Sequence, residues 1–342
     1  MWVDPYPDIS PEKPLFVCIL ANTGTAKIPG ISAAGKSPEM TDFTPAADAE
    51  LVETGSVFSI SEPAMCPSGA PTPAVLTRAS MLLTGMPCLF INAGLNIRPK
   101  IPFIDLNSRP GGDIRKGHAV VDAVDIYRTS ADLGRKLSKL SDLVIIGESV
   151  PGGTTTAMGV MRALGHDGRV SSSFPDNPVG IKGRVVEEGM KASGITFGSL
   201  KTQPMRAIEC LGDPMMAAAA GLVSGLNVKT ILAGGTQMVS VLCIIKALGL
   251  ERDVSIATTS YVANDRTANF REMTEILGYQ AFAADPGFGS SKLQGLRMYE
   301  KGEVKEGVGA GGSMLAAAMM GFSQDEFRKK TEEVYGSLFP IS

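Results

Sequence analysis

The segment 142–164 constrains the fold of this chain more than any other. Its sequence predicts a buried apolar strand over 143–146, a glycine-rich loop over 147–154 and a helix over 155–164. Glu148 lies where the strand ends, and α/β sheets bind their ligands at the carboxyl ends of parallel strands. The free N–H groups of such a loop and the positive end of the helix both favour phosphate. The segment therefore predicts a phosphate-bearing small molecule held beside a carboxylate.

Short apolar runs alternate with helical patterns along the chain. Strands are expected over 15–20, 88–92, 143–146, 230–232 and 254–258. Helices are expected over 73–84, 116–139, 155–164, 181–192, 214–224, 238–248, 265–277, 313–320 and 324–335. Because strands that alternate with helices form βαβ units, we expect a Rossmann-like three-layer α/β fold with a mostly parallel sheet and helices on both faces.

The chain is expected to form one main domain over 15–320. The remaining residues, 321–342, are expected to form a C-terminal helix that packs on this domain or on a dimer partner, with Ser323 as its N-cap. Small residues follow several strands, at 21–24, 92–94, 147–148, 233–236 and 258–260. Since small residues let a ligand approach the backbone, these strand ends predict a shared crevice. Two long irregular segments, 23–44 and 98–117, are of the kind that covers a site or is poorly ordered.

Composition excludes several classes of function. The chain has 342 residues, of which 44% are hydrophobic and 20% charged, with a formal net charge of −3. It has no basic run, so nucleic acid is not expected as a partner. No apolar run approaches the roughly 18 residues of a transmembrane helix, and the acidic, proline-rich N-terminus is unlike a signal peptide. We therefore expect a cytoplasmic protein without a membrane partner.

Cysteine and histidine offer little for a metal site. The five cysteines (Cys18, Cys66, Cys88, Cys210 and Cys243) form no C-x-x-C pair, and several lie in apolar runs. We expect them to be reduced structural thiols. His118 and His166 lack the spacing of metal ligands, so no metal, cofactor or histidine-based catalysis is expected.

Two glycine motifs have competing interpretations. The segment 307–312 fits G-x-G-x-x-G, but polar residues precede it and only one helix follows, which disfavours a dinucleotide site. Glu306 precedes this turn and could be a partly desolvated base, although spacing alone favours a solvated loop with its charged neighbours. Glu148 is favoured as a functional carboxylate over a loop residue that bonds nearby amides. Lys182, taken alone, is expected to be a solvated lysine.

Taken in order, these motifs resemble the nicotinate-nucleotide:dimethylbenzimidazole phosphoribosyltransferase family, in a divergent branch of the archaeal kind. The family's G-E-M-G-I-G-N-T-T is matched by Gly147-Glu-Ser-Val-Pro-Gly-Gly-Thr-Thr155, and its G-E-G-T-G-A by Glu306-Gly-Val-Gly-Ala310. Its early A-G-D-H-G-V motif resembles Ala21-Asn-Thr-Gly24, and its D-G-F strand end resembles Ala233-Gly-Gly-Thr236. The family lysine before an apolar helix falls on Lys182. The resemblance spans roughly 15–320.

The resemblance implies transfer of the phosphoribosyl group of nicotinate mononucleotide to a benzimidazole-like base, in cobamide biosynthesis, by a homodimer without a cofactor. It implies Glu306 as the general base and Glu148 as the residue that orients ribose or base and stabilises positive charge at C1′. The implied phosphate and nucleotide ligands are Gly152, Gly153, Thr154, Thr155, Lys182, Gly307 and Gly309. The implied substrate-binding residues are Asn22, Thr23, Gly24, Gly234, Gly235, Thr236 and Arg297.

The chain departs from the family pattern around the expected base pocket. Asn22-Thr23 replaces the family Asp-His, and residues 299–305 are inserted before Glu306, with Glu303 as an alternative base. Two further hypotheses therefore stay open. The acceptor could be a phenol, a purine or another azole, or the chain could be a catalytically silent nucleotide-binding protein.

Overall fold

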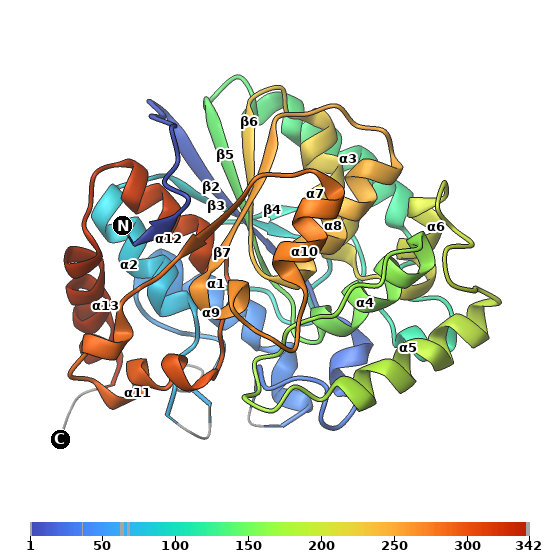
Figure 1. Ribbon diagram of the computed structural model, residues 1–342, viewed down its shortest axis with the longest axis horizontal. Helices are drawn as coiled ribbons and strands as arrows, with labels where there is room; N and C mark the ends of the chain where they lie inside the picture. The colour runs from blue at the N-terminus through green and yellow to red at the C-terminus, as the bar shows by residue number, and fades with distance from the viewer. Residues whose placement is uncertain (1, 36, 62–64, 67–68, 340–342) are drawn as a thin grey trace.

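A computed structural model describes residues 2–35, 37–61, 65–66 and 69–339. Its centre is a sheet of eight strands in the order β1-β8-β7-β6-β5-β2-β3-β4 (Figure 1). The strands are β1 (Val3–Asp4), β2 (Pro14–Leu20), β3 (Cys88–Asn92), β4 (Ile104–Asp105), β5 (Leu143–Ser149), β6 (Lys229–Ala233), β7 (Val254–Thr259) and β8 (Ala281–Ala284). All neighbours pair in parallel except β1, which pairs antiparallel with β8. The predicted α/β fold with a mostly parallel sheet is confirmed.

Strand β2 shows why the sheet needs helices on both faces. Every residue of β2 is buried. Because side chains alternate along a strand, Val17 and Ile19 enter one hydrophobic core whereas Phe16 and Cys18 enter the other. A strand that is apolar at every position is therefore stable only between two layers.

Helices from different parts of the chain cover the two faces (Figure 1). The first core is built with α3 (Ala123–Leu137), α4 (Gly153–Leu164), α5 (Val179–Ser193), α6 (Pro204–Leu211), α7 (Pro214–Gly225), α8 (Thr236–Ala247) and α10 (Phe270–Leu277). The second is built with α1 (Thr44–Thr54), α2 (Ala74–Thr84), α12 (Ala310–Met319) and α13 (Gln324–Leu338). Two short helices, α9 (Ser260–Ala263) and α11 (Gln294–Arg297), lie in connections.

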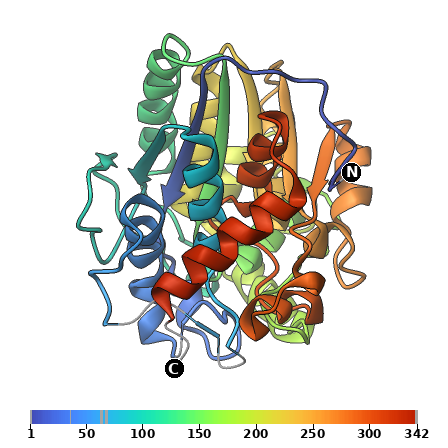
Figure 2. The same ribbon diagram turned by 90° about the vertical axis from the view of Figure 1, so that its left-hand side faces the viewer.

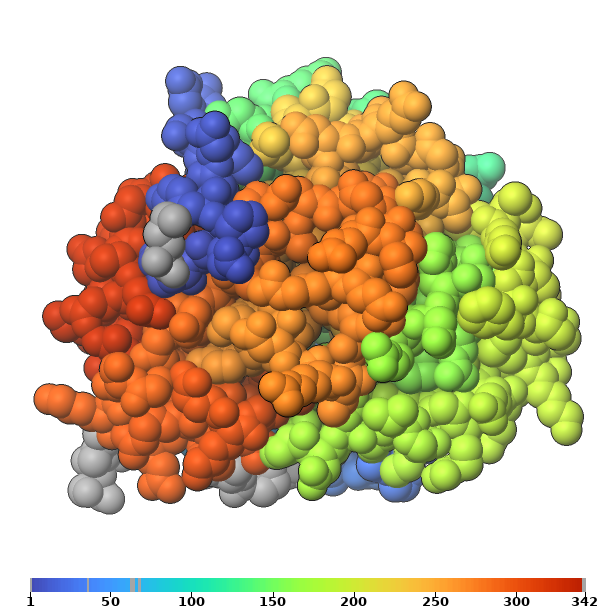
Figure 3. Space-filling view, viewed as in Figure 1, coloured from blue at the N-terminus to red at the C-terminus, as the bar shows by residue number. Residues whose placement is uncertain are grey.

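The N-terminal residues pack against the start of α13 on the second face. Helix α13 crosses α2, as Figure 2 shows, and begins at a capping box in which the Ser323 hydroxyl and the Glu326 side chain each bond the other's backbone N–H. The ring of Trp2 stacks on Phe327 at a centroid distance of 5.5 Å. Figure 3 shows the resulting contact between the blue N-terminal and red C-terminal segments. The last residues of the expected 321–342 segment, 340–342, lie outside the described residues.

The sequence patterns missed several elements. Strand β8 is a short alanine-rich run, and α1 lies where no helix was expected, because its alanines face the sheet without a clear polar stripe. The helix expected over 116–139 begins only at Ala123, after a 3-10 turn over Ile114–Lys116. Within the described ranges, no helix is long and apolar enough to cross a membrane, and all five thiols are free.

Candidate active site

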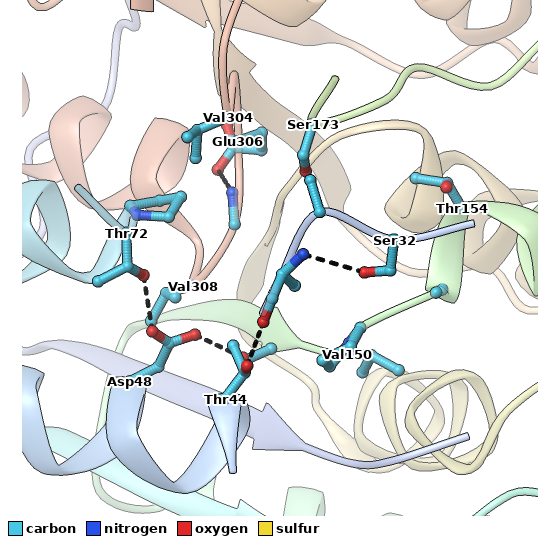
Figure 4. A pocket seen from close by; sticks show the side chains of 18 of the residues that line it. Ser32, Thr44, Asp48, Thr72, Val150, Thr154, Ser173, Val304, Glu306 and Val308 are labelled. Atoms are coloured by element: carbon cyan, nitrogen blue, oxygen red, sulfur yellow. Dashed lines mark hydrogen bonds between the residues drawn. The ribbon is translucent and has the colours of Figure 1, made fainter. Parts of the chain in front are cut away.

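A cavity opens at the carboxyl edge of the sheet, where β5, β6 and β7 end (Figure 4). Both predicted catalytic carboxylates, Glu148 and Glu306, line it. The remaining lining includes segments that are distant in the sequence: 31–35, Thr44, Asp48, Thr72, 149–154, 171–173, 235–237 and 304–308. Two of the five predicted strand ends, 147–148 and 233–236, therefore contribute to one crevice, whereas 21–24, 92–94 and 258–260 do not line it.

The carboxylate of Glu306 is fixed by donors at the starts of two helices. Its Oε2 accepts from the backbone N–H of Thr259 at 2.8 Å and from the hydroxyl of Thr258 at 3.3 Å. The backbone N–H groups of Gly307 and Gly311 donate to Oε1 at 3.1 and 3.2 Å. Burial raises the pKa of Glu306 to about 7, although these hydrogen bonds oppose the rise. A carboxyl group with such a pKa suits general-base work near neutral pH.

The loop that carries Glu306 has an unusual backbone. Val304, Lys305 and Val308 have φ angles of 62°, 60° and 55°. Side chains branched at Cβ rarely adopt positive φ, and such strain concentrates at functional sites. The neighbouring backbone holds the loop in place, since the Val304 N–H donates to the carbonyl of Ser173 at 3.0 Å. The inserted residues do not displace Glu306 from the cavity, and Glu303, the alternative base, does not line it.

Glu148 is held differently. Its side chain is only 4% exposed, and Oε2 accepts from Nε2 of Gln237 at 3.1 Å. Burial raises the pKa of Glu148 well above its ordinary value; the bond from Gln237 opposes this rise, and the negative charges of Asp213 and Glu306 add to it. Burial thus shifts Glu148 toward its neutral form relative to an exposed glutamate, and a neutral carboxyl group can donate a hydrogen bond.

The start of α4 forms one end of the cavity. Gly152 is its N-cap with a φ of 78°, and Gly152, Gly153 and Thr154 all line the cavity. The backbone segment 171–173 lies opposite, and Figure 4 shows Ser173 and Thr154 at this end. Thr155 is fully buried and does not line the cavity.

Lys182 does not lie where a phosphate ligand is expected. Its Nζ is buried and donates to the carbonyl of Ser171 at 2.7 Å and to Oδ1 of Asn177 at 3.2 Å. Lys182 thus stabilises segment 171–173 from the side that faces away from the cavity. Burial lowers the pKa of Lys182 to about 7. Lys305 lines the cavity instead, with its Nζ 3.1 Å from Oδ2 of Asp265.

Other expected site residues divide into two groups. Gly235, Thr236 and Gly307 line the cavity, whereas Asn22, Thr23, Gly24, Gly234, Gly309 and Arg297 do not. Asn22 is a structural residue, because its side chain bonds the backbone of Thr41 and Asn96. Arg297 is exposed and donates to the carbonyl of Ser291.

Sequence reasoning missed Asp48, Thr72, Ser149 and Gln237. Gln237 directly follows the small-residue end of β6, so its position was a usable signal. Asp48 interrupts an alanine run in α1, and an acid inside an apolar run is a second such signal. Thr72 carries no signal of its own, since only tertiary packing brings it to the cavity. In the part of the chain that the structure describes, no group of His, Cys, Asp and Glu side chains is arranged to hold a metal ion.

The fold and cavity define a three-layer α/β protein with paired glutamates at the carboxyl edge of its sheet. The solved nicotinate-nucleotide-dimethylbenzimidazole phosphoribosyltransferase of Thermus thermophilus shares this fold with a TM-score of 0.60 and 14% identity, over 97% of this chain and 87% of that one. A second structure, described as CobT from the same organism, gives a TM-score of 0.59 and 15% identity over 96% and 86%.

Sequence relatives show the family. The chain is 53% identical over 339 residues to a UPF0284 protein of Methanosarcina acetivorans, with 97% of each sequence covered. It is 43% identical to a UPF0284 protein of Methanothermobacter thermautotrophicus, with 96% of this chain and 94% of that sequence covered. No protein-family model matches the chain. The chain belongs to the UPF0284 family.

Proposed function

We propose that this protein transfers the phosphoribosyl group of nicotinate mononucleotide to a benzimidazole-like azole base, in cobamide biosynthesis. The observation that carries the proposal is the position of Glu306. Its carboxyl group has a pKa raised to about 7 and lines a cavity whose other end is a glycine-rich helix start. The fold shared with the Thermus thermophilus phosphoribosyltransferase supports the same class of reaction.

The reaction needs a base but no acid. A ring nitrogen of the acceptor attacks C1′, the bond from C1′ to the nicotinate nitrogen breaks, and its electron pair neutralises the pyridinium. The proton on the acceptor's other ring nitrogen passes to the carboxylate of Glu306, a step typically worth about 10²–10⁴-fold. Attack from the face opposite nicotinate converts a β-nucleotide into an α-nucleotide. Holding both substrates in line supplies further acceleration.

Glu148 takes a different role from that of Glu306. Because its raised pKa favours the neutral form, we assign Glu148 to orientation of the ribose through a hydrogen bond, rather than to charge stabilisation at C1′. Gln237, which donates to Glu148, fixes the orientation of this carboxyl group. Two carboxyl groups in one cavity thus have separate tasks because their surroundings differ.

The 5′-phosphate is assigned to the end of the cavity formed by Gly152, Gly153 and Thr154. Backbone N–H groups at a helix start favour a phosphate. Lys305 replaces Lys182 in our assignment of the cation, because Lys305 lines the cavity whereas Lys182 does not. The ammonium of Lys305 also pairs with Asp265, which orients it. A homodimer remains part of the proposal through the family resemblance.

A binding and turnover experiment tests the proposal. Purified protein is titrated with nicotinate mononucleotide, then assayed for nicotinate release with azole, purine and phenol acceptors. Nicotinate release that requires an azole supports the proposal. Nicotinate release that requires a purine or a phenol would instead identify that class of compound as the acceptor. Nucleotide binding without release from any acceptor would favour the silent binding protein.

A further inference from the structure

The end of the cavity beside Asp48 presents oxygen acceptors that carry no free proton. We infer that the acceptor base bears a hydrogen-bond donor, an exocyclic amine or hydroxyl, on the ring edge that faces Asp48, Thr72 and Ser149. This inference rests on the proposed function and deepens it, because it names a chemical feature of the acceptor.

Asp48 is a buried carboxylate that both lines the cavity and holds two neighbouring hydroxyl groups. Its side chain is 3% exposed. Oδ1 accepts from the Thr72 hydroxyl at 2.6 Å, and Oδ2 accepts from the Ser149 hydroxyl at 2.8 Å. Burial raises the pKa of Asp48 to about 6, so the group is mainly ionised at pH 8. An ionised carboxylate has only acceptor sites.

These bonds fix the direction of the hydroxyl protons of Thr72 and Ser149. A hydroxyl has one proton, and Thr72 and Ser149 both commit theirs to Asp48. The hydroxyl of Thr44, which also lines the cavity, donates to the carbonyl of Ala34. The side-chain oxygens of Asp48, Thr72, Ser149 and Thr44 therefore form a wall whose remaining lone pairs accept hydrogen bonds and whose own protons are already committed.

Such a wall discriminates between ligands. A donor on the ligand pairs with it, whereas a methyl group displaces water from the acceptors and leaves them unpaired. Sites built for a hydrogen bond reject analogues that lack it far more strongly than apolar pockets reject a missing methylene. The wall thus selects for N–H or O–H and against an apolar substituent.

From its position in the cavity, we assign this wall to contact with the acceptor base rather than with the nucleotide. Figure 4 shows Asp48 and Thr72 on the opposite side of the cavity from Thr154, at the phosphate end. Thr72 precedes Pro73, and a Cβ built on Gly307 would lie 3.2 Å from Cγ of Pro73, so the wall adjoins the Glu306 loop. Figure 4 shows Val308 beside Asp48, and the apolar side chains of Met40, Ile60 and Met65 also line the cavity. They suit the flat faces of an aromatic ring whose nitrogen reaches Glu306.

The test compares two isosteric acceptors, 5-aminobenzimidazole and 5-methylbenzimidazole, with nicotinate mononucleotide at pH 8. We expect kcat/KM to favour the amine by roughly 10- to 100-fold in the wild type. Asp48→Asn should lower this preference at least fivefold, because its amide would donate to one of the hydroxyls and turn that proton toward the cavity. Thr72→Val provides a second variant should Asp48→Asn fail to fold, and it should lower the preference in the same direction.

Asp253→Asn is the matched control. Asp253 is an exposed residue that pairs with Lys229 at the opposite edge of the sheet, and this variant should keep the full preference. Equal use of both bases by the wild type, or a preference for the methyl compound, would overturn the inference while the transferase function stands. An unchanged preference in both wall variants, with a raised KM for the nucleotide, would also overturn it and assign the wall to ribose. No product from either base would overturn the proposed function and the inference with it.

Discussion

The backbone N–H of Val308 donates to the carbonyl oxygen of Glu148 at 2.8 Å. This bond joins the two loops that carry the carboxylates of the cavity, although they are far apart in the sequence. A Cβ built on Gly147 would lie 3.0 Å from Cα of Gly309, and one built on Gly309 would lie 2.9 Å from Cα of Gly147. The two glycines therefore let the loops cross in contact, and this crossing places Glu148 and Glu306 in one site.

Removing the charge of Glu306 should stop the chemistry and spare nucleotide binding. We expect Glu306→Gln to lower kcat by about 10²–10⁴-fold, because the acceptor proton then has no base. The Kd for nicotinate mononucleotide should change by less than about threefold. Glu303→Gln is the matched control, since Glu303 lies in the same loop outside the cavity lining. A Glu306→Gln rate within about threefold of wild type would refute the base assignment.

The rate should depend on pH through the same carboxyl group. Its pKa is raised to about 7, so the group is protonated and inactive as a base below this value and ionised above it. We expect log kcat/KM to rise with pH up to about 7 and then to level off. This rising limb should vanish in Glu306→Gln. A wild-type profile that is flat from about pH 5.5 to 8 would contradict the assigned role.

The crossing of the two loops should not tolerate a side chain. Gly309 has a φ of 68°, and an added Cβ would meet both Gly147 and the ring of Phe16 within 3 Å. We expect Gly309→Ala to lower the free energy of unfolding by at least about 2 kcal/mol, measured by urea denaturation. The control is Gly183→Ala, in helix α5, where nothing lies within 4 Å of the new Cβ. Equal effects of both substitutions would argue against a required contact.

Lys305 should affect binding through the phosphate alone. We expect Lys305→Met to weaken binding of nicotinate mononucleotide by roughly 10- to 100-fold, because a charged hydrogen bond is lost. Binding of nicotinate riboside, which has no phosphate, should change little. Lys301→Met tests an exposed lysine of the same segment and should leave both affinities unchanged. A similar loss for both ligands in Lys305→Met would indicate a structural role through Asp265 instead.

The sequence predicted the structure best where an element depends on residues that are neighbours along the chain. The apolar runs of β2 and β5 and the glycines after β5 predicted both the sheet and the edge that holds Glu148, since each feature depends on neighbouring residues. The position of Glu306 at the same edge was predicted from the family motifs and not from the spacing of residues along the chain.

The remaining site depends on tertiary packing, which no local pattern encodes. Lys182 lies in the first turn of α5, which begins at Val179 rather than at the expected residue 181, and its side chain faces inward, so its ammonium bonds protein carbonyls. Lys305 lines the cavity from the inserted loop, where its backbone has a positive φ. Asp48 and Thr72 meet through the packing of α1 against the segment before α2.

The most direct test of the central claim is a product analysis. The protein is incubated with nicotinate mononucleotide and an azole acceptor, nicotinate is quantified by chromatography, and the anomeric configuration of the nucleotide product is determined by NMR. Our account predicts one α-ribosyl-5′-phosphate nucleotide for each nicotinate released. Nucleotide binding without any product, or a product that retains the β configuration, would contradict it.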